Sequence, residues 1–60
     1  MFETLPKDPM LLVSVVNTKL RDYYPNLDML CEELQLEKES LTAKLAEIDY
    51  EYDPVQNRFL

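Results

Sequence analysis

Cys31 carries the most nucleophilic side chain in this 60-residue sequence, so it is the first candidate for catalysis. A cysteine nucleophile needs a neighbouring base, usually histidine, to form its thiolate at neutral pH, and the sequence contains no histidine. Cys31 also falls on an apolar stripe with Leu27, Leu30 and Leu34, where a thiol behaves as a small hydrophobe. We therefore expect no enzyme activity and no catalytic residue.

The carboxylates of the C-terminal part offer metal chemistry instead. Asp49, Glu51 and Asp53 alternate as the first oxygen ligands of an EF-hand loop do. However, Pro54 replaces the glycine that makes the sharp turn of that loop, and Leu60 stands where the closing glutamate belongs. A zinc site is disfavoured as well, because one cysteine and no histidine cannot supply its ligands. We expect neither a metal nor a cofactor, and we interpret the acidic series as the solvated face of a strand.

Charge and composition narrow the remaining classes of function. Six basic and 12 acidic residues give a net charge of −6, and all of this excess lies between Leu27 and Leu60. A hydrophobic content of 47% is typical of a folded chain. The longest apolar stretch, residues 10–16, is interrupted by Ser14 and is far shorter than the about 20 residues of a membrane-spanning helix. With no secretion signal and a single cysteine, we expect a cytoplasmic protein without membrane contact.

Helix signals occur at three places along the chain. Asp8 before Pro9 forms a strong helix start, and Asn26 provides another after the proline at position 25. Apolar residues then recur at intervals of three and four, as on the buried face of a helix. These signals predict the elements of one small domain, residues 1–60: an N-terminal arm over 1–7 and helices over 8–24, 26–35 and 37–48.

The end of the chain changes to an alternating pattern, which indicates a strand. Tyr50 and Tyr52 alternate with acidic residues. Asp53 before Pro54 is suited to open a type I turn, after which Asn57 tolerates a left-handed conformation. A β-hairpin is therefore predicted over 50–60. The expected fold is mainly α: a three-helix, helix-turn-helix-like domain with a short C-terminal β-hairpin, similar to a winged helix.

A helix-turn-helix corner raises the question of DNA binding. Such binding needs lysine and arginine to neutralise phosphates, and the helix expected to read the groove carries Lys38 and Lys44 against Glu37, Glu39 and Glu47. Its local charge is therefore 2 − 3 = −1, which opposes binding. We expect no nucleic-acid binding by the isolated chain. The alternative is a DNA-associated regulator that acts as a dimer or with a basic partner.

The helix over 8–24 is apolar on two sides, which points to an additional contact. Leu11 and Val15 fall almost opposite the main apolar side, which consists of Leu12, Val13, Val16, Leu20 and Tyr23. A 60-residue domain has little material with which to cover the second side. Either the hairpin folds over Leu11 and Val15, or a second subunit does so in a symmetric dimer.

Polar residues on the same helix give a second reason to expect a partner. Asn17 and Arg21, four positions apart, either bond to the chain break near Tyr24 or contact a partner protein. Arginine and tyrosine are favoured anchors at the centres of interfaces. The candidate partner interface comprises Leu11, Val15, Asn17, Lys19, Arg21, Tyr23 and Tyr24. We expect a non-enzymatic protein-interaction or regulatory module that binds a protein partner or associates with itself as a homodimer.

Several blocks of the sequence resemble a known family. They are the run from Leu5 to Asp22, the segment 27–31, and the pair Tyr50-Glu51-Tyr52-Asp53 and Gln56-Asn57-Arg58-Phe59. The first run contains the fairly specific block Asn17-Thr18-Lys19-Leu20-Arg21-Asp22. The chain is thus similar to the short bacterial proteins catalogued as domain of unknown function four thousand two hundred and fifty. The resemblance implies a free-standing single-domain bacterial protein with no known cofactor and no assigned catalytic residue.

Overall fold

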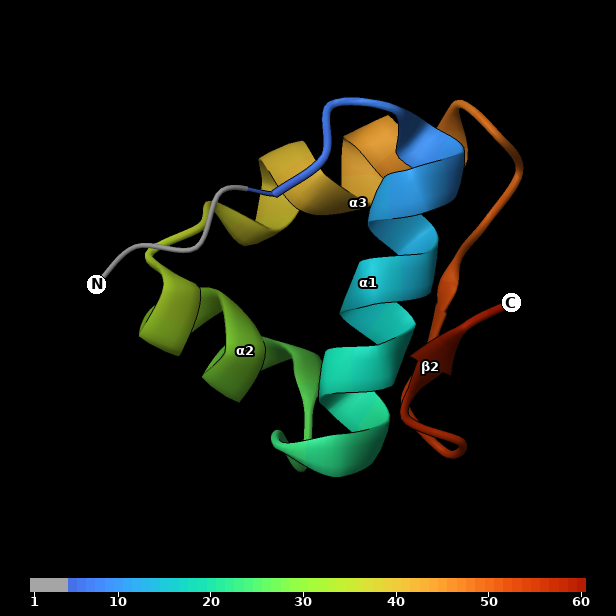
Figure 1. Cartoon of the computed structure of the whole chain (residues 1–60). Coiled ribbons are helices and arrows are strands. Elements are labelled where there is room, and N and C mark those ends of the chain that lie inside the picture. The colour runs from blue at the N-terminus through green and yellow to red at the C-terminus, as the bar shows by residue number, and fades with distance from the viewer. Residues whose placement is uncertain (1–4) are drawn as a thin grey trace.

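A computed structural model of the chain describes residues 5–60 and consists of three helices followed by a two-stranded sheet (Figure 1). The elements, in chain order, are α1 (Pro9–Asp22), α2 (Leu27–Leu34), α3 (Lys38–Ala46), β1 (Tyr52–Asp53) and β2 (Arg58–Phe59). The predicted fold class, mainly α with a C-terminal hairpin, is therefore confirmed. Of the expected arm, residues 1–4 lie outside the described residues, and 5–7 precede α1 without helical structure.

The helix starts follow the predicted caps. Asp8 accepts a hydrogen bond from the backbone N–H of Met10 at 2.9 Å, and Pro9 occupies the first position of α1. Asn26 caps α2 in the same way, through a 2.8 Å bond from the N–H of Met29. Both caps satisfy backbone donors that have no partner within the helix.

The helix ends differ from the prediction, by one residue in α2, which ends at Leu34 rather than at position 35, and by two residues in the other helices. α1 ends at Asp22 rather than at position 24, because Pro25 forces the preceding residue out of the helical region. α3 ends at Ala46 rather than at position 48, and the chain then makes a turn in which Asp49 adopts a left-handed φ of 65°. Asp49 thus belongs to the turn after α3, and the predicted acidic strand face over 49–53 is wrong in its first residue.

The hairpin is short but well defined. β1 and β2 pair antiparallel, with Tyr52 opposite Phe59, and Glu51 and Leu60 extend the pairing by exchanging two 2.9 Å backbone hydrogen bonds. The Asp53 carboxylate accepts a 2.8 Å bond from the N–H of Val55 within the turn. Asn57 adopts a left-handed φ of 55°, as its residue type predicts.

The hydrophobic core lies between α1 and the other elements. α1 contacts α2, α3 and β2, and Figure 1 shows α2 and α3 on one side of it and the hairpin on the other. Phe59 of β2 is 1% exposed and belongs to this core. The buried set is Leu12, Val13, Val16, Leu20, Leu27, Leu30, Cys31, Leu41, Leu45 and Phe59. None of the helices within residues 5–60 has the length and apolar character needed to cross a membrane.

Candidate functional site

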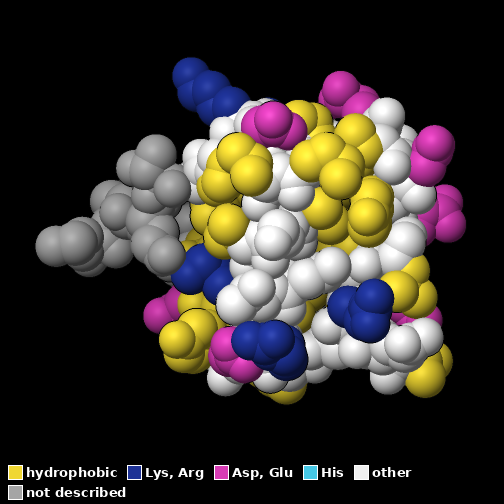
Figure 2. Space-filling view, turned by 45° about the vertical axis from the view of Figure 1, so that its right-hand side comes forward, with side chains coloured by type: hydrophobic (Ala, Val, Ile, Leu, Met, Phe, Trp, Pro, Cys, Tyr) yellow, Lys and Arg dark blue, Asp and Glu magenta, His cyan; other side chains and the backbone are white. Residues whose placement is uncertain are grey.

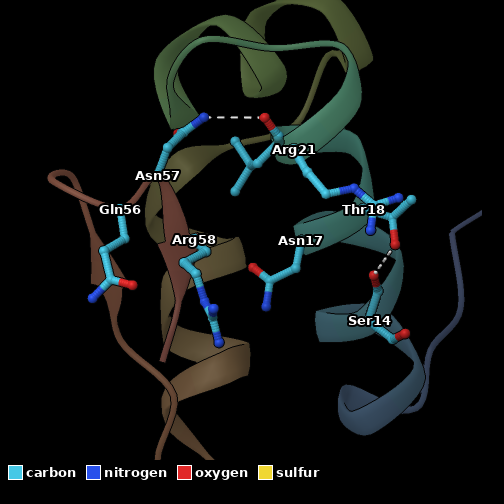
Figure 3. Close-up of a pocket in the computed structure, with 8 residues that line it drawn as sticks. Ser14, Asn17, Thr18, Arg21, Gln56, Asn57 and Arg58 are labelled. Atoms are coloured by element: carbon cyan, nitrogen blue, oxygen red, sulfur yellow. Dashed lines mark hydrogen bonds between the residues drawn. The ribbon is translucent and has the colours of Figure 1, made fainter.

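A groove runs between α1 and the hairpin. It has a volume of about 570 Å³ and is lined by Ser14, Asn17, Thr18, Leu20 and Arg21 of α1 and by Gln56, Asn57 and Arg58 of the hairpin. In Figure 3, Asn17 points from α1 toward the hairpin and Asn57 points from the hairpin toward the end of α1, whereas the Arg21 side chain extends past Thr18 at the outer edge of the groove. We call it the α1–hairpin groove.

Asn17 joins the two walls of the groove. Its Nδ2 donates to the carbonyl oxygen of Phe59 at 3.1 Å, and its Oδ1 accepts from the N–H of Phe59 at 2.7 Å. The side-chain amide therefore pairs with β2 as a neighbouring strand would, and it satisfies backbone groups that face away from β1. Of the two alternatives for Asn17, the bond to the chain break near Tyr24 is wrong, because its partner, Phe59, lies 42 residues along the chain.

Asn57 joins the hairpin to the end of α1 and supplies the bonds at the chain break. Its Nδ2 donates to the carbonyl oxygens of Leu20 at 3.1 Å and Tyr24 at 2.9 Å. Its Oδ1 accepts a 2.6 Å bond from the hydroxyl of Tyr52, which in turn accepts from the N–H of Leu27 at 3.2 Å. The start of α2, the end of α1 and the hairpin thus share one hydrogen-bond network.

Arg21 and Arg58 place guanidinium groups at the groove. Arg21 forms a bidentate pair with Asp22, with Nε–Oδ1 at 2.9 Å and Nη2–Oδ2 at 3.0 Å. This hydrogen bond raises the pKa of Arg21 and lowers the pKa of Asp22. Arg58 has no ion-pair partner among residues 5–60. None of the eight residues that line the groove carries a carboxylate.

The seven predicted interface residues lie along α1 and just beyond its end. Asn17 and Arg21 line the α1–hairpin groove. At the end of α1, Lys19 lies with its ammonium 5.9 Å from the ring centre of Tyr23, which meets Tyr24 edge to face at 6.5 Å. Arg21 also lines a second pocket with Tyr23, Tyr24 and Asn57, so it connects the α1–hairpin groove to the two tyrosines at the end of α1.

The remaining pair, Leu11 and Val15, lies on the outer side of α1. Leu11 is 59% exposed and Val15 is half-buried. The alternative in which the hairpin folds over both residues is wrong for Leu11, because the hairpin directs Phe59 into the core instead. The other alternative, in which a second subunit covers Leu11 in a symmetric dimer, stays a prediction.

Six groove residues were missed as site residues by sequence reasoning: Ser14, Thr18, Leu20, Gln56, Asn57 and Arg58. A signal for the helical wall was present, since Ser14, Asn17, Thr18 and Arg21 follow the spacing of one helix face. No comparable signal existed for the hairpin wall, because the contacts that place it span 33 to 42 residues.

The other candidate chemistries find little support in the geometry. Cys31 is buried within the helical core, and this burial raises the pKa of its thiol, which disfavours the reactive thiolate. Residues 5–60 contain no group of three or more Cys, Asp or Glu side chains arranged to hold a metal ion.

The corner between α2 and α3 contains an ion pair. The ammonium of Lys38 lies 2.8 Å from Oδ1 of Asp28, so the first basic residue of α3 is paired across the corner. The hydrogen bond that Lys38 donates to Asp28 raises the pKa of Lys38. The pair is exposed and therefore weak, but it places a carboxylate beside the cation that a phosphate would have to reach.

Comparison with known proteins gives one match. A family model described as "Domain of unknown function (DUF4250)" matches residues 6–59. The chain matches no curated protein and no solved structure. The match covers all five helices and strands.

Proposed function

The chain belongs to the DUF4250 family, and we propose that it is a non-enzymatic protein-binding module that docks a partner in the α1–hairpin groove. The observation that carries the proposal is the groove itself, whose two walls are fixed by side-chain amides from opposite sides. Asn17 binds the backbone of β2, and Asn57 binds the backbone at the end of α1. A groove already held in shape loses little conformational entropy when a ligand enters it.

The chemistry of the lining residues supports binding rather than catalysis. The hydroxyls, amides and two guanidinium groups of the groove donate or accept hydrogen bonds, but they include no histidine, carboxylate or thiol, the usual acids, bases and nucleophiles of enzymes. The one thiol, Cys31, lies in the core and not in the groove. Such a surface can hold and orient a partner without transforming it. A single buried thiol also suits a reducing compartment, and we place the module in the bacterial cytoplasm.

A site-specific photo-crosslinker tests the proposal. We expect a benzophenone amino acid at Thr18, an exposed groove residue, to give adducts of defined mass in the cells that produce the protein. The matched control carries the same group at Glu33, exposed on α2, where we expect no such adduct. Excess unlabelled protein should suppress the Thr18 adducts. Identical adducts from both positions, or none from Thr18, would contradict docking in the groove.

Duplex DNA is the alternative ligand, for a chain acting as a dimer or with a basic partner. The order of three helices followed by a hairpin is the observation that favours it. The paired state of Lys38 weakens this alternative. We expect fluorescence anisotropy at low salt to show no saturable binding of the isolated chain below about 100 μM, the weak end of ordinary non-specific affinity. Micromolar binding that falls steeply with salt would favour the DNA alternative over the protein-binding proposal.

A further inference from the structure

We infer, on the basis of the proposed function, that the partner segment entering the α1–hairpin groove is acidic and that Arg21 and Arg58 bind its carboxylates. The observation behind the inference is that two arginines, one from α1 and one from β2, line a groove whose eight lining residues include no acid. The occupant is a segment of another protein, recognised by its carboxylates.

The groove is an exception to the charge of the whole chain. Acidic residues outnumber basic ones by 12 to 6, yet two of the six basic residues line this groove. Figure 2 shows the face on which α1 and the hairpin meet: dark-blue groups flank a white polar centre, one of the lower ones has a magenta group beside it, and most other magenta groups lie toward the upper and outer edges. A local positive region on an acidic protein orients an acidic partner toward it.

Arg58 has unused binding capacity. Asp53 stands directly opposite it in the hairpin register, but the carboxylate of Asp53 accepts bonds from the N–H of Val55 at 2.8 Å and from Nε2 of Gln56 at 3.3 Å. The turn therefore occupies the nearest acid, and Arg58 keeps no partner among the described residues. Figure 3 shows its side chain extended along the groove. A guanidinium group in this state favours a bidentate carboxylate.

Arg21 has a partner that an incoming carboxylate can supplement or replace. Its Nε and Nη2 bind Asp22, and both side chains are exposed. Exposed pairs of this kind contribute little to stability, so their exchange for an intermolecular pair costs little. Since a guanidinium group carries five N–H donors, Arg21 also has donors left for a second carboxylate while Asp22 stays bound.

The charge of the chain favours a peptide over a polyanion as the occupant. A nucleic acid presents dense negative charge to a large surface, and the net charge of −6 opposes that approach. A peptide with a few carboxylates needs only the two arginines. A second copy of the chain would bring the same net charge of −6, which also disfavours it relative to a different protein.

The test is an NMR titration with two short peptides, one of alternating glutamate and alanine and the other with glutamine in place of glutamate. We expect the glutamate peptide to shift the backbone signals of Ser14, Thr18, Gln56 and Arg58. Its affinity should exceed that of the glutamine peptide by about tenfold and should fall as salt rises. Absence of these shifts, or equal affinity for both peptides, would overturn the inference.

Three variants with the same change of charge identify the contributing residues. Arg21→Gln and Arg58→Gln should each weaken binding of the glutamate peptide several-fold. Lys7→Gln removes an exposed cation outside the groove and should leave binding unchanged. An unchanged affinity in Arg58→Gln, or an equal loss in all three variants, would refute the assigned contacts. Inorganic phosphate serves as the control ligand. If the groove bound phosphate as tightly as the glutamate peptide, its ligand would be a simple anion and the inference of a peptide occupant would be wrong.

The same variants separate this inference from the proposed function. If the double variant Arg21→Gln/Arg58→Gln retains the Thr18 crosslinks, the chain binds a protein in the groove, but the inference that this protein is acidic is wrong. If the glutamate peptide binds while Thr18 gives no adduct in cells, the groove binds carboxylates but the protein-binding function fails. A Thr18 adduct with the mass of two chains would identify a second copy as the occupant and overturn the inference.

Discussion

Replacing Phe59 with alanine is expected to unfold most of the chain at room temperature. The side chain is 1% exposed, and its ring lies 5.5 Å from that of Tyr52. Truncating a buried phenylalanine to alanine costs about 3–5 kcal/mol. A domain of this length has a total stability of roughly 3–9 kcal/mol, at about 0.05–0.15 kcal/mol per residue. The loss is therefore comparable to the entire free energy of unfolding.

Circular dichroism at the helix minimum measures this effect as lost ellipticity and a lowered midpoint of thermal unfolding. Phe59→Leu is the matched control, because it retains most of the apolar volume and should cost only about 1.5 kcal/mol. If Phe59→Ala melted within a few degrees of the unmodified chain, the hairpin would not be part of the core. The α1–hairpin groove would then lack a fixed second wall.

Local chemistry explains why the helix starts and the hairpin turn were predictable. Asp8, Asn26 and Asn57 act within a few residues of their own position, through caps and a left-handed turn residue, so the sequence around them contains the relevant information. The end of α3 was harder to predict from the sequence. As an acidic residue, Asp49 fits the alternation of acidic and aromatic residues that follows it, and this alternation predicts a strand. Its φ of 65° instead places it in a turn.

The groove was only partly predictable from the sequence, because its two walls come from distant parts of the chain. Asn17 and Arg21 were recognised as exceptional polar residues of an apolar helix, and both line the groove. Their partners are a strand backbone 42 positions away and a neighbouring aspartate, and periodicity carries no information about the first of these. Arg58 had no local signal at all. It becomes notable only once the fold brings β2 beside α1.

Net charge was informative for the chain but not for this surface. The excess of acidic residues disfavours contact with polyanions, and the pairing of Lys38 with Asp28 extends that argument to the α2–α3 corner. The same excess makes the acid-free lining of the groove more notable, because an average surface of this protein would include carboxylates. Selectivity for an acidic partner then depends on where the few cations lie and not on their number.

Replacing Asn57 with alanine should have the second largest effect, about 3 kcal/mol of lost stability. The side chain makes three hydrogen bonds, two to the carbonyl oxygens of Leu20 and Tyr24 and one from the hydroxyl of Tyr52. Each contributes about 0.5–1.5 kcal/mol. Alanine must also adopt the left-handed φ of 55°, which costs about 1–2 kcal/mol. Urea unfolding followed by fluorescence of the tyrosines measures the total.

Asn57→Gly separates the two contributions, because glycine removes the amide but adopts a positive φ without strain. We expect Asn57→Gly to be more stable than Asn57→Ala by about 1 kcal/mol and still less stable than the unmodified chain. Tyr52→Phe should lose less stability in the Asn57→Gly background than alone, since the hydroxyl then has no amide to bind. Full stability of Asn57→Gly would mean that the backbone conformation alone joins the hairpin to α1. Additive losses would mean that Tyr52 and Asn57 act independently, and the groove wall would then depend on Asn17.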